Sequence, residues 1–154
     1  MLVGTAVLAL VGASGVACGS SAPPPELAEL TSQLDAARSD SQLASDAATT
    51  AQPPMRPALA AVSSERSKHA EALSNEIARL TGEPTTSSST TTTSAAQAAA
   101  PTMKDVIAAL RESADSAGQA AAQLSGYRAG LLGSIAASCT AAYTVTLADR
   151  GGAP

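Results

Sequence analysis

One stretch of the chain carries an apolar stripe with the 3.6-residue period of an α-helix. Its positions recur every three or four residues and are Met55, Leu59, Val62, Arg66, His69, Leu73, Ile77 and Leu80. A helix with such a stripe has to bury that face. The only histidine of the chain, His69, lies on the stripe, and Glu65 precedes it by four residues on the same side of the helix. If the protein has a chemical site, we expect it here.

The composition of the chain indicates that other helices, and not a β-sheet, cover this face. Phe and Trp are absent, and Tyr127 and Tyr143 are the only aromatic residues. A core of Leu, Ile, Val and Ala packs densely when helices approach closely, so the sequence favours a helix bundle over a β-sandwich. A chain of 154 residues suggests one domain. The net charge of −4 argues against a nucleic-acid partner, because phosphate binding needs a basic face.

Helical spacing of apolar residues predicts four helices, at about residues 26–48, 54–81, 103–124 and 127–147. Gly82, with Pro84 after it, is expected to end the second helix. Thr102 and Asp105 have the spacing of a capping box at the start of the third. In the fourth helix, small residues should allow close helix approach, namely Gly130, Gly133, Ala136 and Ala137.

A low-complexity linker, residues 83–101, separates the second and third helices. Thr and Ser fill residues 85–94 and mostly Ala follows, so the segment has nothing to bury and we expect it to be disordered. It is long enough to cross from one end of a bundle to the other. The predicted plan is two helical hairpins in one bundle domain, residues 26–148, with a tail at 149–154; a linker between antiparallel neighbours is the alternative.

The N-terminal segment looks like a targeting signal. Residues 2–17 are apolar or small, and shorter than the ~20 residues of a spanning helix. The run from Gly15 to Cys18 resembles a bacterial lipobox, which implies a signal peptide at 1–17 and a diacylglycerol on the Cys18 sulfur. Gly15 replaces the usual aliphatic residue and no basic residue precedes Arg38, so an uncleaved anchor and a buried helix stay as alternatives.

Residues 18–25 end in three prolines and are expected to be a stiff tether that lifts the domain off the membrane. The predicted location is therefore the extracytoplasmic face of the cell membrane, with a lipid anchor. If Cys18 is acylated, Cys139 has no partner within the chain. A Cys18–Cys139 disulfide is the alternative.

Two stretches carry a resemblance to a known family. Met55–Leu73 and Leu131–Leu147 resemble the second and fourth helices of the ferritin-like domain family of unknown function found in actinobacterial proteins. The resemblance implies an all-α, Ala-rich, ferritin-like four-helix bundle with a low-complexity insert between its hairpins. It implies no known activity.

Di-iron members of the fold use a carboxylate from each of two helices and a Glu-x-x-His pair from each of the other two. His69 matches a histidine position of the family, but Glu65 lies four residues before it, and Arg66 occupies the position that the pair requires. Cys139 stands where the resemblance places an acidic residue, and the chain has no second histidine. We therefore expect no di-iron site, no other metal and no cofactor.

A lone histidine on an apolar stripe is most simply a side chain of a polar core. Glu65, Asp35 or Asp115 could orient the His69 ring, and Arg66 could join as a buried ion pair. Cys139 would then act as a small apolar side chain. A Cys–His nucleophile pair is the catalytic alternative, but no motif supplies an oxyanion hole.

Serine–histidine–aspartate triads, phosphate loops and Cys-x-x-Cys pairs are absent from the sequence, so we predict no enzyme. The predicted function is a lipid-anchored cell-envelope protein whose non-catalytic domain serves interaction or scaffolding. Its partner would be an unidentified protein or a second copy in a homodimer. The alternative is a small-ligand or metal-binding module with a pocket around Glu65, His69 and Cys139.

Overall fold

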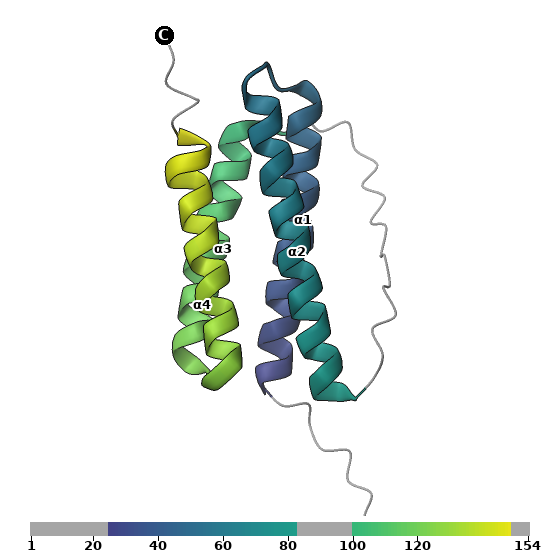
Figure 1. Ribbon diagram of the computed structural model, residues 1–154, viewed down its shortest axis with the longest axis vertical. Helices are drawn as coiled ribbons and strands as arrows, with labels where there is room; N and C mark the ends of the chain where they lie inside the picture. Colours follow the sequence, from purple (N-terminus) through teal and green to yellow (C-terminus); the bar gives the residue numbers. More distant parts are fainter. Residues whose placement is uncertain (1–24, 83–99, 149–154) are drawn as a thin grey trace, which may run out of the picture.

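The computed structural model describes residues 25–82 and 100–148, and these form four long helices (Figure 1). They are α1 (Pro25–Thr50), α2 (Met55–Thr81), α3 (Met103–Gln123) and α4 (Gly126–Ala141), which continues into a π-helical turn, η1 (Ala142–Thr146). The prediction of an all-helical chain with four helices is confirmed, since no strand occurs in these two ranges. The predicted signal peptide, most of the tether and linker, and the tail lie outside the described residues.

The helix ends follow the expected local chemistry. Gly82 takes the left-handed conformation, with φ of 71°, and its amide donates to the Ala78 carbonyl, which ends α2 as predicted. Thr102 and Asp105 form the predicted reciprocal capping box on α3. The π-helical turn was not predicted. It lies where Arg111 of α3 stacks over the Tyr143 ring, 5.2 Å from its centroid, and this contact joins the turn to the bundle.

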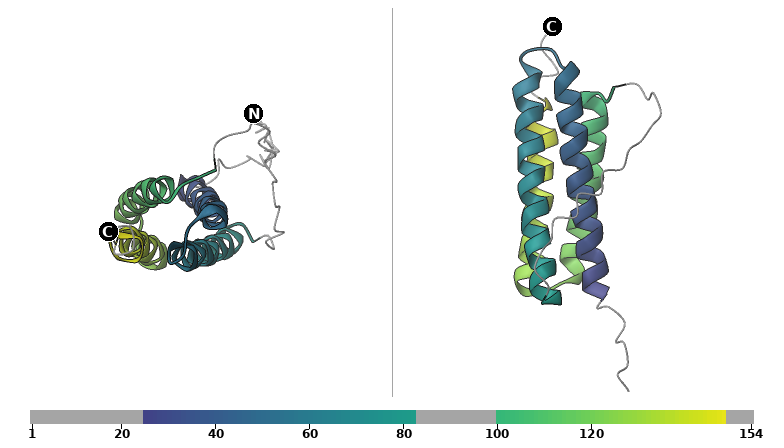
Figure 2. Two further views of the ribbon diagram at one scale, coloured as in Figure 1. Left: turned by 90° about the horizontal axis from the view of Figure 1, so that it is seen from above. Right: turned by 90° about the vertical axis from the view of Figure 1, so that its right-hand side faces the viewer.

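Seen from above, the helices follow the order α1, α2, α4, α3 around the bundle (Figure 2). The closest packing lies within each hairpin, and α1 also packs along α3. The two hairpins, α1–α2 and α3–α4, therefore contact each other mainly through α1 and α3. Helix α2 ends, and α3 begins, at opposite ends of the bundle (Figure 1). The segment that connects them has to cover the length of the bundle, as the predicted plan requires.

The core contains no fully buried aromatic ring within the described ranges. Its largest fully buried side chains are Leu30, Leu59, Leu73, Leu110, Leu132, Ile135, Leu147, Val62, Val106 and Cys139. Alanines fill the spaces between them. The predicted close approach at Ala136 is present, because a Cβ added to Gly118 would lie 3.9 Å from the Ala136 Cβ. The same prediction is wrong for Gly130 and Gly133, where a Cβ would meet nothing within 4 Å.

The fourth helix is unusually apolar. Together with the π-helical turn, residues Gly126–Thr146 have the length and mean hydropathy, 1.2, that a membrane-crossing helix needs. No other helix of the described residues passes this test. Leu132, Ile135 and Cys139 of this helix are nevertheless buried in the core that all four helices share. We therefore treat α4 as a helix of the bundle.

The crossing connection predicts a threshold in linker length. Helix α3 has 21 residues and is therefore about 31 Å long. Deleting residues 86–94 leaves about 12 connecting residues, which can span roughly 40 Å, so the bundle should still fold and its closure entropy should change by less than ~1 kcal/mol. Deleting residues 85–98 leaves about seven, which reach only roughly 25 Å and cannot connect the two ends.

Urea unfolding followed by far-ultraviolet circular dichroism, with size-exclusion chromatography, checks this prediction. The first deletion should match the wild-type midpoint, and the second should be strongly destabilised or form swapped dimers. Equal stability of both deletions would contradict a connection that crosses the bundle.

Candidate functional site

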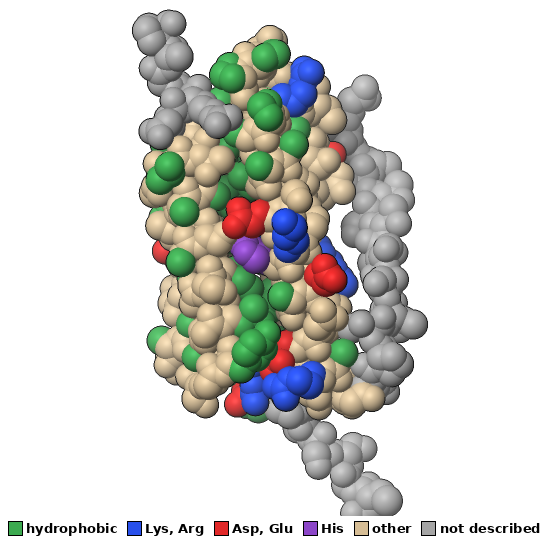
Figure 3. Space-filling view, viewed as in Figure 1, with side chains coloured by type: hydrophobic (Ala, Val, Ile, Leu, Met, Phe, Trp, Pro, Cys, Tyr) green, Lys and Arg blue, Asp and Glu red, His purple; other side chains and the backbone are tan. Residues whose placement is uncertain are grey.

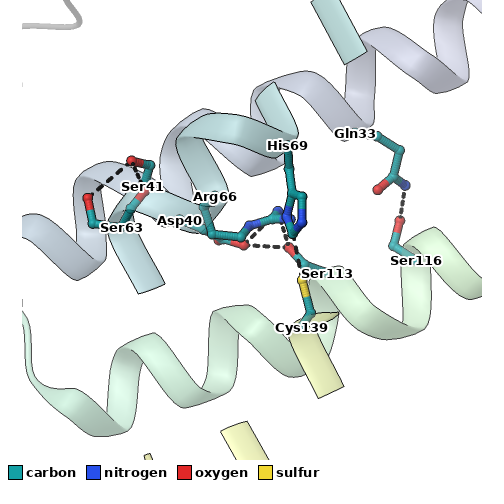
Figure 4. Close-up of polar contacts among 9 residues, drawn as sticks. All are labelled: Gln33, Asp40, Ser41, Ser63, Arg66, His69, Ser113, Ser116 and Cys139. Carbon is teal, nitrogen blue, oxygen red and sulfur yellow. Dashed lines mark hydrogen bonds and ion pairs between the residues drawn. The ribbon is translucent and has the colours of Figure 1, made fainter. Parts of the chain in front are cut away.

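A buried polar cluster lies at the middle of the bundle, and every helix contributes to it (Figure 4). We call it the Arg66 cluster. It consists of Asp40 from α1, Arg66 and His69 from α2, Ser113 from α3 and Cys139 from α4. The predicted residues Arg66, His69 and Cys139 are therefore brought together. Asp40 and Ser113 were not predicted.

Arg66 is the centre of the cluster and is only 2% exposed. Its Nη2 lies 2.9 Å from Asp40 Oδ2 and donates to Ser113 Oγ at 3.2 Å. Its Nη1 lies 3.3 Å from Cys139 Sγ and 3.2 Å from His69 Nδ1. Ser113 Oγ donates in turn to Asp40 Oδ2 at 2.7 Å, which closes a ring of three polar groups.

This arrangement offsets the free-energy cost of burying the Arg66 charge. A guanidinium inside a protein needs a carboxylate and further hydrogen bonds, because otherwise its desolvation costs several kcal/mol. Asp40 provides the carboxylate and is itself buried. Small neighbours leave room for the large guanidinium, since Ala37 and Ala44 flank Asp40 on the buried face of α1. Among the described residues, Arg66 Nε is the one buried side-chain nitrogen or oxygen without a hydrogen-bond partner.

His69 lies at the edge of the cluster and is half-buried. A guanidinium can only donate hydrogen bonds, so His69 Nδ1 accepts from Arg66 and the neutral ring carries its proton on Nε2. Burial lowers the pKa of His69, the Arg66 charge lowers it further, and the Glu65 charge opposes both. The ring is therefore held neutral at physiological pH. The expectation of a fully core-facing His69 is wrong, because of the two polar members of the stripe only Arg66 is fully buried.

Glu65 has a different role from the one expected. Its carboxylate is exposed and accepts a hydrogen bond from Ser138 Oγ of α4, so it links α2 to α4 at the surface. The hydrogen-bond partner of His69 is Arg66, and Glu65 acts on the ring through its charge alone. The prediction that Glu65 orients the ring is therefore wrong.

The two other carboxylates proposed for His69 also lie elsewhere. Asp35 and Asp115 are exposed, and Asp35 lies 4.0 Å from Arg38 on its own helix. The carboxylate that joins the cluster is Asp40, which pairs with Arg66. A signal for it exists in the sequence, because Asp40 falls between Ala37 and Ala44 at the three- and four-residue spacing of the buried face. Ser113 has the same signal between Leu110 and Ala117.

Cys139 is a buried free thiol. Burial raises its pKa, and the charges of Asp40 and Glu65 add to this, while Arg66 and a backbone hydrogen bond oppose it. The thiol is therefore protonated at neutral pH, and a protonated buried thiol is a poor nucleophile. Its contact with Arg66 makes it a weak acceptor in the cluster, in addition to its apolar packing.

The geometry offers little to a metal ion. No three His, Cys, Asp or Glu side chains of residues 25–82 and 100–148 converge in a way that could hold one. The carboxylate and thiol of the cluster both contact the Arg66 guanidinium, whose positive charge would repel a cation from the same space.

A second charged cluster, also not predicted, joins three helices at one end of the bundle. Glu76 of α2 is buried and accepts two hydrogen bonds from Arg79, at 2.8 and 2.6 Å. Arg128 of α4 lies 3.5 Å from the same carboxylate and also contacts Glu26 of α1. Figure 3 shows Lys or Arg side chains gathered at this end of the molecule. We call these four residues the Glu76 cluster.

Comparison of the chain with protein-family models, with curated proteins and with solved structures finds no match.

The buried ion pair predicts a large effect on stability. Asp40→Ala leaves the Arg66 charge buried without a partner, and we expect it to lower the free energy of unfolding by about 3–5 kcal/mol. Asp35→Ala is the matched control on the same helix, because its carboxylate is exposed, and should cost less than about 0.5 kcal/mol. Urea unfolding measures both.

A double variant distinguishes the loss of the ion pair from the cost of leaving the Arg66 charge buried without a partner. Asp40→Leu combined with Arg66→Met removes both charges and should recover most of the loss caused by Asp40→Ala. If Asp40→Ala is as mild as Asp35→Ala, the pair does not hold the helices together.

The lowered pKa of His69 predicts how stability depends on pH. The unfolded ring takes up its proton near its ordinary pKa of 6.5, whereas the folded ring stays neutral to lower pH. The unfolded state then binds more protons, so the stability that depends on neutral His69 is complete above the unfolded pKa and decreases as the pH falls towards the folded pKa. The midpoint of urea unfolding should therefore decrease from about pH 7.5 to about pH 5.5, above the range where most carboxylates titrate.

His69→Leu has no ring to protonate and should give a flatter profile over the same range. An identical slope in wild type and variant would mean that another group causes the pH dependence.

Proposed function

We propose that this chain is a lipid-anchored protein of the cell envelope whose helical domain is non-catalytic and serves interaction or scaffolding. The observation that carries the proposal is that the members of the Arg66 cluster bond to one another, with Arg66 Nε its one buried polar atom that lacks a partner. Four of its members bond to Arg66, and the arginine charge is matched by Asp40. Groups that already bond to one another have little capacity left for a substrate.

The protonation states point in the same direction. A general base has to be free to accept a proton, but the accepting nitrogen of His69 is occupied by Arg66. A nucleophilic cysteine needs a lowered pKa, whereas burial raises that of Cys139. Neither member of the Cys–His pair considered from the sequence has the state that catalysis needs. This supports a structural role for the cluster.

For the fold, we propose a ferritin-like bundle of the actinobacterial family that the sequence resembles. Helix order supports this, because α2 and α3 run in the same direction with a long segment between two hairpins (Figure 1). The family's fold implies no activity, so the proposal agrees with a non-catalytic domain.

The lipid anchor is proposed on the sequence of residues 2–18. An apolar run, small residues and then Cys18 give the pattern that a lipobox has. Pro25, where α1 begins, follows Cys18 by only seven residues, so the bundle would lie close to the outer face of the membrane. An interaction partner would therefore be another envelope protein or a second copy of this chain.

A small-ligand or metal-binding module is the second candidate, because part of His69 reaches the surface. Figure 3 shows part of the histidine, coloured purple, at the surface of the bundle. Its Nε2 is not used within the cluster, and the Glu65 charge acts on the same ring. This candidate needs only the outer edge of the cluster, not its buried centre.

Replacing Cys18 tests the anchor. Cys18→Ala should move the protein from the membrane fraction to a soluble or unprocessed form, whereas the wild-type protein should resist a high-salt wash, since a lipoprotein carries more than one acyl chain. Cys139→Ala is the matched control, because it removes the other thiol and should leave the protein in the membrane fraction. If the Cys18→Ala variant fractionates and migrates like the wild type, the anchor is wrong.

A further inference from the structure

One end of the bundle is the end at which α1 begins, so it is the end nearest to residue 18 along the chain. Helices α1 and α4 begin there, and α2 and α3 end there (Figure 1). We call it the anchor end and define it by Pro25, Thr81, Gln123 and Gly126. The opposite end carries the turn between α1 and α2 and the π-helical turn η1.

Chain length limits how far the anchor end can stand from a lipid on Cys18. The chain takes seven Cα–Cα steps from Cys18 to Pro25, which reach at most about 25 Å even when it is fully extended. Helix α2 has 27 residues and is therefore about 40 Å long. In an upright bundle, the anchor end is close to the membrane and the opposite end is remote. A bundle lying on its side would bring both ends to the surface.

The side chains of the anchor end suit a headgroup layer. Tyr127 is 66% exposed and is one of two exposed large apolar side chains of the described residues; the other, Val145, is 58% exposed and lies at the opposite end of the same apolar run. Tyrosine favours the membrane interface, because its ring is apolar and its hydroxyl is polar. About two thirds of Tyr127 is therefore left uncovered within the described structure.

The Glu76 cluster places two arginines at the same end of the bundle as Tyr127. The Arg79 side chain is 61% exposed although it bonds to Glu76, and Arg128 is partly exposed. A guanidinium has five donors, so each can bond to a lipid phosphate while it keeps its carboxylate. Glu76 and Glu26 balance the positive charges of Arg79 and Arg128. Contact with lipid should therefore depend on Tyr127 and on the tether at residues 18–25 more than on net charge.

We propose that the anchor end rests on phospholipid headgroups, with Tyr127 at the membrane interface and Arg79 and Arg128 next to lipid phosphates. The bundle then stands upright, and its opposite end is presented to partners outside the membrane. This inference rests on the proposed lipid anchor at Cys18.

Fluorescence quenching can test the orientation, because the chain has no tryptophan. Tyr127→Trp and its matched control Val145→Trp place a single reporter at exposed positions about 27 Å apart along the helix. Each variant is prepared as full lipidated protein and reconstituted into phosphatidylcholine–phosphatidylglycerol vesicles, with or without brominated acyl chains. Circular dichroism confirms that both variants fold.

We expect brominated lipid to reduce the emission of the Tyr127→Trp variant about twofold, and that of Val145→Trp hardly at all. Equal quenching of both would show a bundle on its side, and quenching of neither would show a bundle clear of the surface; either result overturns the proposal. Flotation of the vesicles separates these results from failure of the anchor, since protein that does not float with the lipid refutes the anchor and the orientation together.

Discussion

The structure depends on one buried ion pair, Arg66 with Asp40. The rest of the core consists mainly of leucines and alanines, whose packing specifies position only through shape. The Arg66 cluster is directional, because a slide of any helix by one turn, about 5.4 Å, would break its bond to the guanidinium. We therefore regard the pair as the device that fixes the register of four similar Ala-rich helices, a role known for some buried polar groups.

The sequence was sufficient for the helices and their caps, because these depend on neighbours within a few residues. Gly82 and the Thr102–Asp105 pair are examples. The Asp40 and Ser113 partners of Arg66 were missed, because they come from other helices and follow only once each helix is rotated into place. Their spacing on buried faces was visible, but spacing alone does not say which faces meet. Glu65 was misassigned for the same reason, since α4 provides Ser138 as a nearer partner.

The two charged clusters divide the molecule into parts with different roles. The Arg66 cluster is enclosed by all four helices and holds the domain together. The Glu76 cluster joins α1, α2 and α4 at the anchor end and leaves Arg79 exposed. Under the proposed lipid anchor, the function would lie at the surface of the domain and in its position relative to the membrane. On the same proposal, a partner protein would reach the end opposite the anchor end and the outer face of α4, where Arg128 is the one charged residue of Gly126–Thr146.

The central claim is that the Arg66 cluster has a structural role and binds no metal. Thermal melting of the wild type and of His69→Leu, each with and without stoichiometric Fe(II), Zn(II) or Cu(II), tests it most directly. A metal that binds only the folded state raises the melting temperature. The account predicts that no metal shifts the melting temperature of either protein. A rise in the wild type alone, at near-stoichiometric metal, would contradict it and make His69 the ligand of a metal-binding module.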